Sequence, residues 1–198
     1  MSVLEAPARP VLDQRILDAT LRCVARWGVG KTTLEDVARE AGCSRATVYR
    51  SVPGGKDGLI EAVVAHELDG FFARLGERLD AASSLEDALV QGMAFSSQWL
   101  ANHAALQFML AYEPETVLPH IAFRRMNDVL AVAAAFVAPY LVRWLPADDA
   151  LRAAEWGARI VLSYTSCPAD DVDLADEASA RRLVQTFVLP GLVTPTSK

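Results

Sequence analysis

The sequence lacks the patterns that mark several large classes of protein. No stretch alternates apolar and polar residues as a strand does; apolar residues recur at spacings of three and four, which is typical of helices. The longest apolar run, residues 129–142, contains Pro139 and is too short to span a bilayer, so no membrane partner is expected. Residues 1–10 lack the basic start and apolar stretch of a secretory signal, and we expect them to form a disordered arm.

Cysteine and histidine are scarce and scattered. The cysteines, Cys23, Cys43 and Cys167, are odd in number and form no C-x-x-C pair, which is typical of reduced thiols in a cytoplasmic protein. The histidines have no metal-ligand spacing, no G-x-S-x-G motif is present, and no pair of carboxylates is set apart by its surroundings. We therefore predict neither an enzyme nor a bound metal or cofactor.

Positive charge is in deficit overall but not at the N-terminus. The net charge of the chain is −6. Residues 1–56 hold 9 Lys and Arg against 6 Asp and Glu, whereas residues 57–198 hold 10 against 19. A basic head on an acidic body predicts an anionic partner for the head alone.

One glycine-containing segment resembles part of a phosphate-binding loop. Gly30, Lys31 and Thr32 match the end of G-x-x-x-x-G-K-[ST], but Ala25 stands where the first glycine belongs. A P-loop also needs a strand before it, and the preceding residues have helical period. We interpret the glycines as the end of a helix; a P-loop nucleotide hydrolase is the alternative from another class of protein.

The periodicity and capping signals predict an all-α fold. Helices are expected at 13–27, 34–41 and 45–50, and then at 56–81, 84–101, 102–112, 119–145, 148–165 and 176–189. Thr33 with Asp36, and Ser84 with Asp87, have the spacing of capping boxes, Ser44 suits an N-cap, and Asn102 is a further candidate cap. This organisation predicts a three-helix helix-turn-helix domain over residues 1–55 and a six-helix domain over residues 56–198.

The second and third helices form a pair joined by a turn at Gly42. The third helix would face outward with Arg45, Thr47, Tyr49 and Arg50. Such a helix suits the major groove, where arginine can bind guanine with two hydrogen bonds and threonine can contact a thymine methyl group. A plain helical hairpin with solvated charges is the alternative.

The residues of this pair carry a family resemblance. T-L-E-D-V-A-R-E-A-G-C-S-R-A-T-V-Y-R at 33–50, followed by K-D-G-L-I at 56–60, closely resembles the N-terminal domain of the TetR family of bacterial transcriptional regulators, over residues of about 13–75. The resemblance implies DNA contacts, with Arg45 and Thr47 reading bases and with phosphate contacts from Thr33, Ser44, Tyr49 and Lys56. Ser51, Val52 and an extra residue before Lys56 depart from the family pattern.

The resemblance also implies a homodimer and a ligand pocket in the acidic body. The last two helices would form the dimer interface, with Trp156, Ile160, Tyr164, Leu183 and Phe187, and the dimer would read a palindromic operator. A pocket for a small hydrophobic effector is expected from Phe95, Trp99, Phe108, Met109, Tyr112, Phe123 and Met126, although such residues also suit a core. Polar candidates nearby are Asn102, His103, Gln107, Arg124 and Arg125. We expect a repressor released by its effector; an activator or an effector-independent regulator of the same fold is the alternative.

Overall fold

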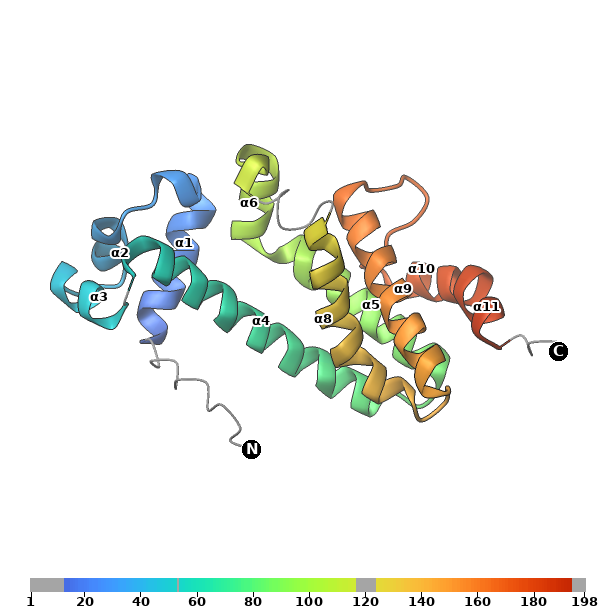
Figure 1. The fold of residues 1–198 in the computed structure, drawn as a ribbon. Helices are drawn as coiled ribbons and strands as arrows, with labels where there is room; N and C mark the ends of the chain where they lie inside the picture. The colour runs from blue at the N-terminus through green and yellow to red at the C-terminus, as the bar shows by residue number, and fades with distance from the viewer. Residues whose placement is uncertain (1–12, 53, 117–123, 194–198) are drawn as a thin grey trace, which may run out of the picture.

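The computed structural model describes residues 13–52, 54–116 and 124–193, and their regular elements are all helices (Figure 1). The all-α prediction is confirmed for these ranges. The expected N-terminal arm and Phe123 lie outside the described residues. Within the described part of the chain, no helix is both long and apolar enough to cross a bilayer.

Three helices, of which the second and third are short, form a head at one end of the long helix α4, Gly55–Ala81 (Figure 1). They are α1 (Gln14–Lys31), α2 (Leu34–Glu40) and α3 (Arg45–Ser51). Their buried apolar side chains form one cluster, which also includes Leu59 and Val63 from α4. The first turns of α4 therefore belong to the packing of the head, beyond residue 55, where the sequence analysis divides the chain.

The backbone leaves helical geometry near the end of α1, where the sequence predicts the helix to finish. Gly28 has φ 81° and ψ 170°. A side chain makes that φ costly, so the glycine allows the chain to turn there. One further turn follows, and the Thr32 hydroxyl then donates a hydrogen bond to the Gly28 carbonyl at 2.6 Å. We call residues 28–32 the glycine loop.

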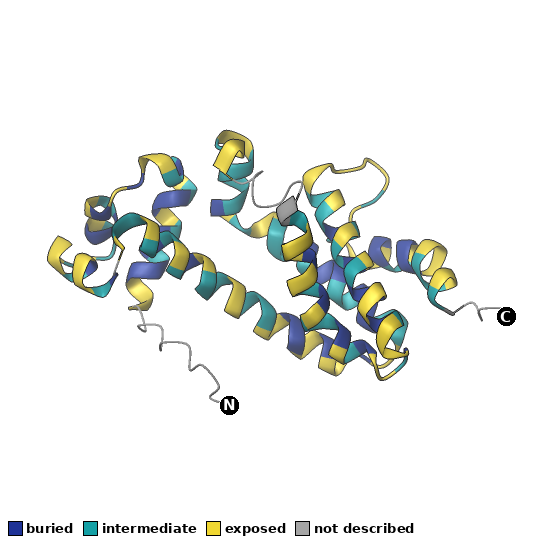
Figure 2. Cartoon of the chain, viewed as in Figure 1, coloured by how far each residue is buried: buried dark blue, intermediate teal, exposed yellow. Residues whose placement is uncertain are grey.

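The rest of the chain forms a helical body around the far end of α4. It contains α5 (Leu85–Asn102), α6 (Ala104–Tyr112), α8 (Arg124–Leu141) and α9 (Ala147–Ser166), followed by α10 (Glu177–Leu183), the π-helical turn η1 (Val184–Val188) and α11 (Leu189–Val193). Figure 2 shows the buried residues concentrated where α4, α5, α8 and α9 face one another. In contrast, α6 packs chiefly against α1 of the head.

Three boundaries in the body differ appreciably from the sequence prediction, the first being α8, which is expected to continue to residue 145 and ends at Leu141. The N-cap of α6 is His103 rather than Asn102, because the His103 Nδ1 accepts a hydrogen bond from the Leu106 N–H at 3.1 Å. The C-terminal helix is interrupted by η1. Pro190 has no N–H to donate to the carbonyl four residues earlier, and a proline ring crowds that carbonyl, so a wider turn relieves the clash.

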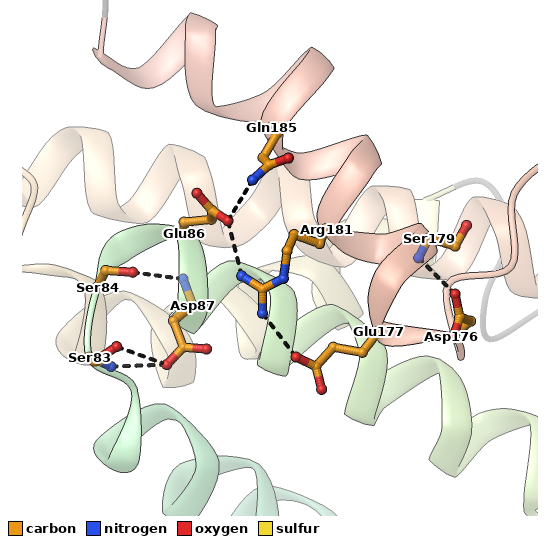
Figure 3. A network of polar contacts seen from close by, with 9 residues as sticks. All are labelled: Ser83, Ser84, Glu86, Asp87, Asp176, Glu177, Ser179, Arg181 and Gln185. Carbon is orange, nitrogen blue, oxygen red and sulfur yellow. Dashed lines mark hydrogen bonds and ion pairs between the residues drawn. The ribbon is translucent and has the colours of Figure 1, made fainter.

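A polar network joins the C-terminal helices to the start of α5 (Figure 3). Glu86 accepts hydrogen bonds from Arg181 at 3.0 Å and from Gln185 at 2.9 Å, and Arg181 also contacts Glu177 at 2.9 Å. Ser84 caps α5 through its hydroxyl, as predicted, but the Asp87 carboxylate accepts from the Ser83 N–H. The two hydrogen bonds that Glu86 accepts from Arg181 and Gln185 fix the direction of α10 across α5.

Candidate nucleic-acid interface and ligand cavity

The helix pair of the head is held by local caps and one buried anchor. Thr33 caps α2 in a reciprocal box with Asp36, and Ser44 caps α3 by accepting from the Thr47 N–H at 3.1 Å. The turn between the helices passes through Gly42 at φ 66°. Val48 is fully buried against the head core. Because Val48 fixes which face of α3 points inward, the neighbouring polar residues face solvent.

The outward face of α3 contains the predicted base-reading residues. Arg45, Tyr49 and Arg50 are exposed, and Thr47 is partly buried. The Arg45 guanidinium forms an ion pair with Glu35 of α2, donates to the Tyr49 hydroxyl at 3.0 Å and lies 5.0 Å from the Tyr49 ring. The hydrogen bond to Tyr49, and then the charge of Glu35, raise the pKa of Arg45. These contacts are open to solvent and therefore weak enough to be exchanged for a base edge.

The predicted phosphate contacts lie around the glycine loop and the helix caps. The Thr33 hydroxyl donates to Asp36 Oδ2 at 2.6 Å, and this bond is the largest cause of the lowered pKa of Asp36. The Lys56 Nζ donates to the Gly30 carbonyl at 3.0 Å. Sequence reasoning missed this contact, since it joins the start of α4 to a loop 26 positions earlier. Arg50 contacts the Ala46 carbonyl of its own helix at 3.3 Å.

An apolar cavity of about 390 Å³ lies between α4, α5, α8 and α9 in the body. Its walls include Phe71, Phe72 and Leu75 of α4, Met93 and Trp99 of α5, Val132 and Val137 of α8, and Ala154, Gly157 and Val161 of α9. Among the described lining residues, Asp128 is the one with a charge. A cavity with this composition suits an apolar molecule with at most one polar group.

The structure brings together only part of the predicted pocket. Trp99 lines the apolar cavity, and Phe95 and Trp99 line a separate groove of about 540 Å³ between α1, α4, α5 and α6, which also contains Asn102 and His103. Phe108 and Tyr112 contact each other on α6, with ring centroids 4.8 Å apart.

The remaining pocket candidates lie elsewhere. Met109 and Met126 are not among the described lining residues of either cavity, and neither is Gln107, which donates to the Leu100 carbonyl. The side chains of Arg124 and Arg125 lie outside the described part of the chain. The aromatic residues of α6 are away from the apolar cavity because that helix packs against the head. Sequence reasoning missed Phe71 and Phe72 as cavity residues; the apolar period of α4 is the signal that could have found them.

The predicted dimer residues belong to the last helices of the body. Trp156 on α9 and Phe187 in η1 are 63% and 78% exposed, although both are large and apolar. Ile160 and Tyr164 are partly buried against the body core, and Leu183 is buried within it. The structure thus separates two exposed side chains from three that support the packing of the body.

The described residues contain no group of His, Cys, Asp and Glu that could hold a metal ion. What the fold presents instead is an exposed polar helix on a helix-turn-helix head, joined by one long helix to a body with an apolar cavity. This arrangement defines a helix-turn-helix regulator that binds DNA. Residues 16–63 match the family model for "Bacterial regulatory proteins, tetR family", so the head of this chain is a DNA-binding domain of the TetR family of bacterial transcriptional regulators.

Similar proteins agree with this assignment over nearly the whole chain. The HTH-type transcriptional regulator Rv1255c of Mycobacterium tuberculosis is 29% identical over 98% of this chain and 91% of its own length. The regulator AlkX of M. tuberculosis is 26% identical over 91% of this chain and 86% of its own length.

Solved structures show the same fold. The TetR family repressor AlkX from Dietzia, implicated in biodegradation of n-alkanes, has a TM-score of 0.62 at 23% identity, over 90% of this chain and 93% of its own. The fatty acid degradation regulator FadR from Bacillus halodurans has a TM-score of 0.66 at 15% identity, over 94% and 98%.

Proposed function

We propose that this regulator is a homodimeric repressor that leaves a palindromic operator when a neutral long-chain molecule enters the apolar cavity. The observation that carries the proposal is the lining of that cavity: aromatic and aliphatic side chains with a single described charge, Asp128. The names of two similar proteins, a repressor implicated in n-alkane biodegradation and a fatty acid degradation regulator, support a chain-like effector.

The cavity favours a neutral chain over a fatty acid. The described lining residues include no cationic side chain, so among them a bound carboxylate would find no partner and would meet the like charge of Asp128, which is exposed at the cavity. An unpaired buried charge is costly, whereas an alcohol can donate a hydrogen bond to the Asp128 carboxylate. The binding energy of the chain would come from apolar burial alone.

The head supplies the operator contacts. We assign base reading to Arg45 and Thr47, and phosphate contacts to Thr33, Ser44, Tyr49, Arg50 and Lys56. The exposed position of Arg45 near the start of α3 supports its role, because the N-terminal residues of a recognition helix lie closest to the bases. Phosphate contacts make affinity fall steeply with salt, whereas base contacts set sequence preference.

The exposed aromatic residues of the last helices support the homodimer. Trp156 and Phe187 would be covered by a second copy, since large apolar side chains that are exposed in a single chain are typical of interaction surfaces. Replacing both with Asp should convert a dimer to a monomer in sedimentation velocity. Val64→Asp is the matched control, because Val64 is also apolar and 51% exposed but lies on α4.

The effector is tested by release of operator DNA. Fluorescence anisotropy of a labelled duplex from the region upstream of the gene would first establish salt-dependent binding. 1-Dodecanol and dodecanoate, which share a chain and differ in the head group, are then titrated. We expect release by 1-dodecanol at about tenfold lower concentration, corresponding to ~1.4 kcal/mol. Equal or stronger release by dodecanoate would contradict the neutral-chain assignment, and Asp128→Asn should narrow the difference between the two.

Release requires the effector to favour one arrangement of the protein over another. A ligand shifts an equilibrium only by its differential affinity for the two states. Helix α4 forms one wall of the cavity, and its first turns carry Leu59 and Val63 of the head core. A change in the packing of α4 around the cavity would therefore alter the spacing of the two heads in the dimer.

A further inference from the structure

The glycine loop holds a carboxylate from the body. The backbone N–H of Val29 donates to Glu113 Oε2 at 2.8 Å, and the N–H of Gly30 donates to Oε1 at 3.2 Å. Consecutive backbone N–H groups that point to one side form an anion site. The segment that resembles a phosphate-binding loop in sequence therefore does bind an anion, but this anion is the side chain of Glu113.

The loop and the carboxylate fit each other closely. A Cβ placed on Gly28 would lie 2.2 Å from Glu113 Oε1, so the carboxylate fills the space that a side chain at residue 28 would need. Glu113 is the C-cap of α6, and its own N–H donates to the Met109 carbonyl at 2.9 Å. The carboxylate is thus held at the end of a helix rather than on a free loop.

The opposite side of the same loop contacts the DNA-binding residues. The Gly30 carbonyl accepts from the Lys56 Nζ, and the residue after the loop is Thr33, the N-cap of α2. A shift of the Gly30 peptide would move the oxygen that holds Lys56 and the start of the helix that supports α3. The loop therefore connects Glu113 to two residues, Lys56 and Thr33, to which we assign operator contacts.

The other end of α6 is tied to the wall of the apolar cavity. Trp99, which lines the cavity, contacts the ring of His103 with centroids 4.7 Å apart. His103 caps α6 and also contacts Glu67 of α4 at 3.2 Å. A molecule that displaces Trp99 would push the start of α6, and α6 carries Glu113 at its end.

We propose that Glu113 is a positioning residue that holds the glycine loop in the arrangement that binds operator, and that displacement of α6 by an effector withdraws it. The second half of this inference rests on the proposed effector function. The first half does not, because it is argued from the hydrogen bonds between Glu113 and the loop alone.

The test compares Glu113→Gln with Glu115→Gln. Both substitutions remove one negative charge, but Glu115 is exposed two residues further along the chain. We expect Glu113→Gln to weaken operator binding about tenfold, because a neutral amide binds the loop N–H groups less strongly than a carboxylate does. The ratio of operator affinities without and with 1-dodecanol should fall by a similar factor, whereas Glu115→Gln should match the wild type in both measurements.

Amide hydrogen exchange separates positioning from a general loss of stability. In Glu113→Gln the amides of Val29 and Gly30 should exchange faster, while those of the buried head residues Val37 and Val48 should not change. Gly28→Ala, which crowds the carboxylate and also strains the backbone at φ 81°, should lower operator affinity at least as much as Glu113→Gln does, and the loss in the double variant should be smaller than the product of the two single factors. Independent factors in the double variant would overturn the proposal.

The outcomes distinguish the two proposals. If wild-type protein is not released by 1-dodecanol, but Glu113→Gln weakens operator binding and Glu115→Gln does not, the effector assignment fails and the positioning role stands. If 1-dodecanol releases the wild-type protein, and Glu113→Gln matches the wild type both in operator affinity and in release by 1-dodecanol, the positioning role fails. Tighter operator binding by Glu113→Gln would also overturn it, because the loop would then be held in the wrong arrangement for DNA.

Discussion

Gly157 offers a direct way to fill the apolar cavity. It is buried in α9, lines the cavity, and a Cβ added there would meet nothing within 4 Å. Glycine in a helix interior costs roughly 0.5–1 kcal/mol relative to alanine, so Gly157→Ala should raise the free energy of unfolding by about that amount. The side chain of leucine adds three further carbons, which should point into apolar space.

The expected increase in the free energy of unfolding for Gly157→Leu is the sum of three contributions. Three buried carbons contribute about 2.4 kcal/mol at ~0.8 kcal/mol each. The lost rotamer freedom of leucine offsets roughly 0.5–1 kcal/mol. With the helix term, the net gain is about 2 kcal/mol, which in a chain of this size corresponds to a rise in Tm of roughly 4–8 °C.

The assay combines thermal unfolding, followed by circular dichroism, with release of operator by 1-dodecanol. Gly157→Leu should be more stable than the wild type, bind operator, and require a much higher concentration of 1-dodecanol for release. Gly70→Ala is the control for helix propensity, because Gly70 lies inside α4 with only Arg74 near its added Cβ, at 3.8 Å. A lower Tm for Gly157→Leu, or an unchanged response to 1-dodecanol, would refute the reasoning that this space is open and that it is the effector site.

Three other predictions concern the head and the thiols. Arg45→Ala should relax base preference at one operator position by about 1–3 kcal/mol, whereas Lys56→Ala should weaken binding to all sequences and flatten its salt dependence; a competition assay against single-base variants separates the two. Thr33→Ala should cost about 1 kcal/mol of stability at neutral pH, with rescue by Thr33→Ser. The folded pKa of Asp36 lies below its ordinary value of 3.8, so the stabilisation from its capping bond is present above pH 3.8 and is lost as the pH falls through the lowered pKa. In urea titrations from pH 7 to pH 3, the free energy of unfolding should therefore fall less in Thr33→Ala than in the wild type. Burial raises the pKa of the Cys23 thiol, so a disulfide reagent at pH 8 should modify exposed Cys167 quickly and Cys23 only at the rate of unfolding; equal rates for the two thiols would contradict the burial of Cys23.

The head is the part of the protein that sequence reasoning described most completely. Its signals are local: Thr33 and Asp36 are three residues apart, Ser44 precedes the helix that it caps, and Gly42 forms the turn between them. Periodicity at three and four residues likewise specifies helices without reference to their partners. The residues that face outward on α3 follow from the single buried position of Val48.

The cavity depended on how the helices of the body pack. The aromatic residues of α6 have the composition of a pocket, yet α6 packs against the head, and the cavity is lined instead by Phe71, Phe72 and the small residues of α9. Composition cannot separate these cases, because an apolar side chain suits a core, a cavity or an interface equally well. Only the crossing of one helix over another decides which of the three it occupies.

The glycine loop shows the same division within a few residues. By itself, the sequence determined that helical geometry is interrupted at Gly28 and that Thr33 begins the next helix, because backbone freedom and capping act over one turn. The anion that occupies the loop was decided by tertiary structure, since Glu113 is 84 residues from Val29 along the chain. No local rule predicts a partner at that separation; the packing of α6 on α1 places the carboxylate within hydrogen-bonding distance.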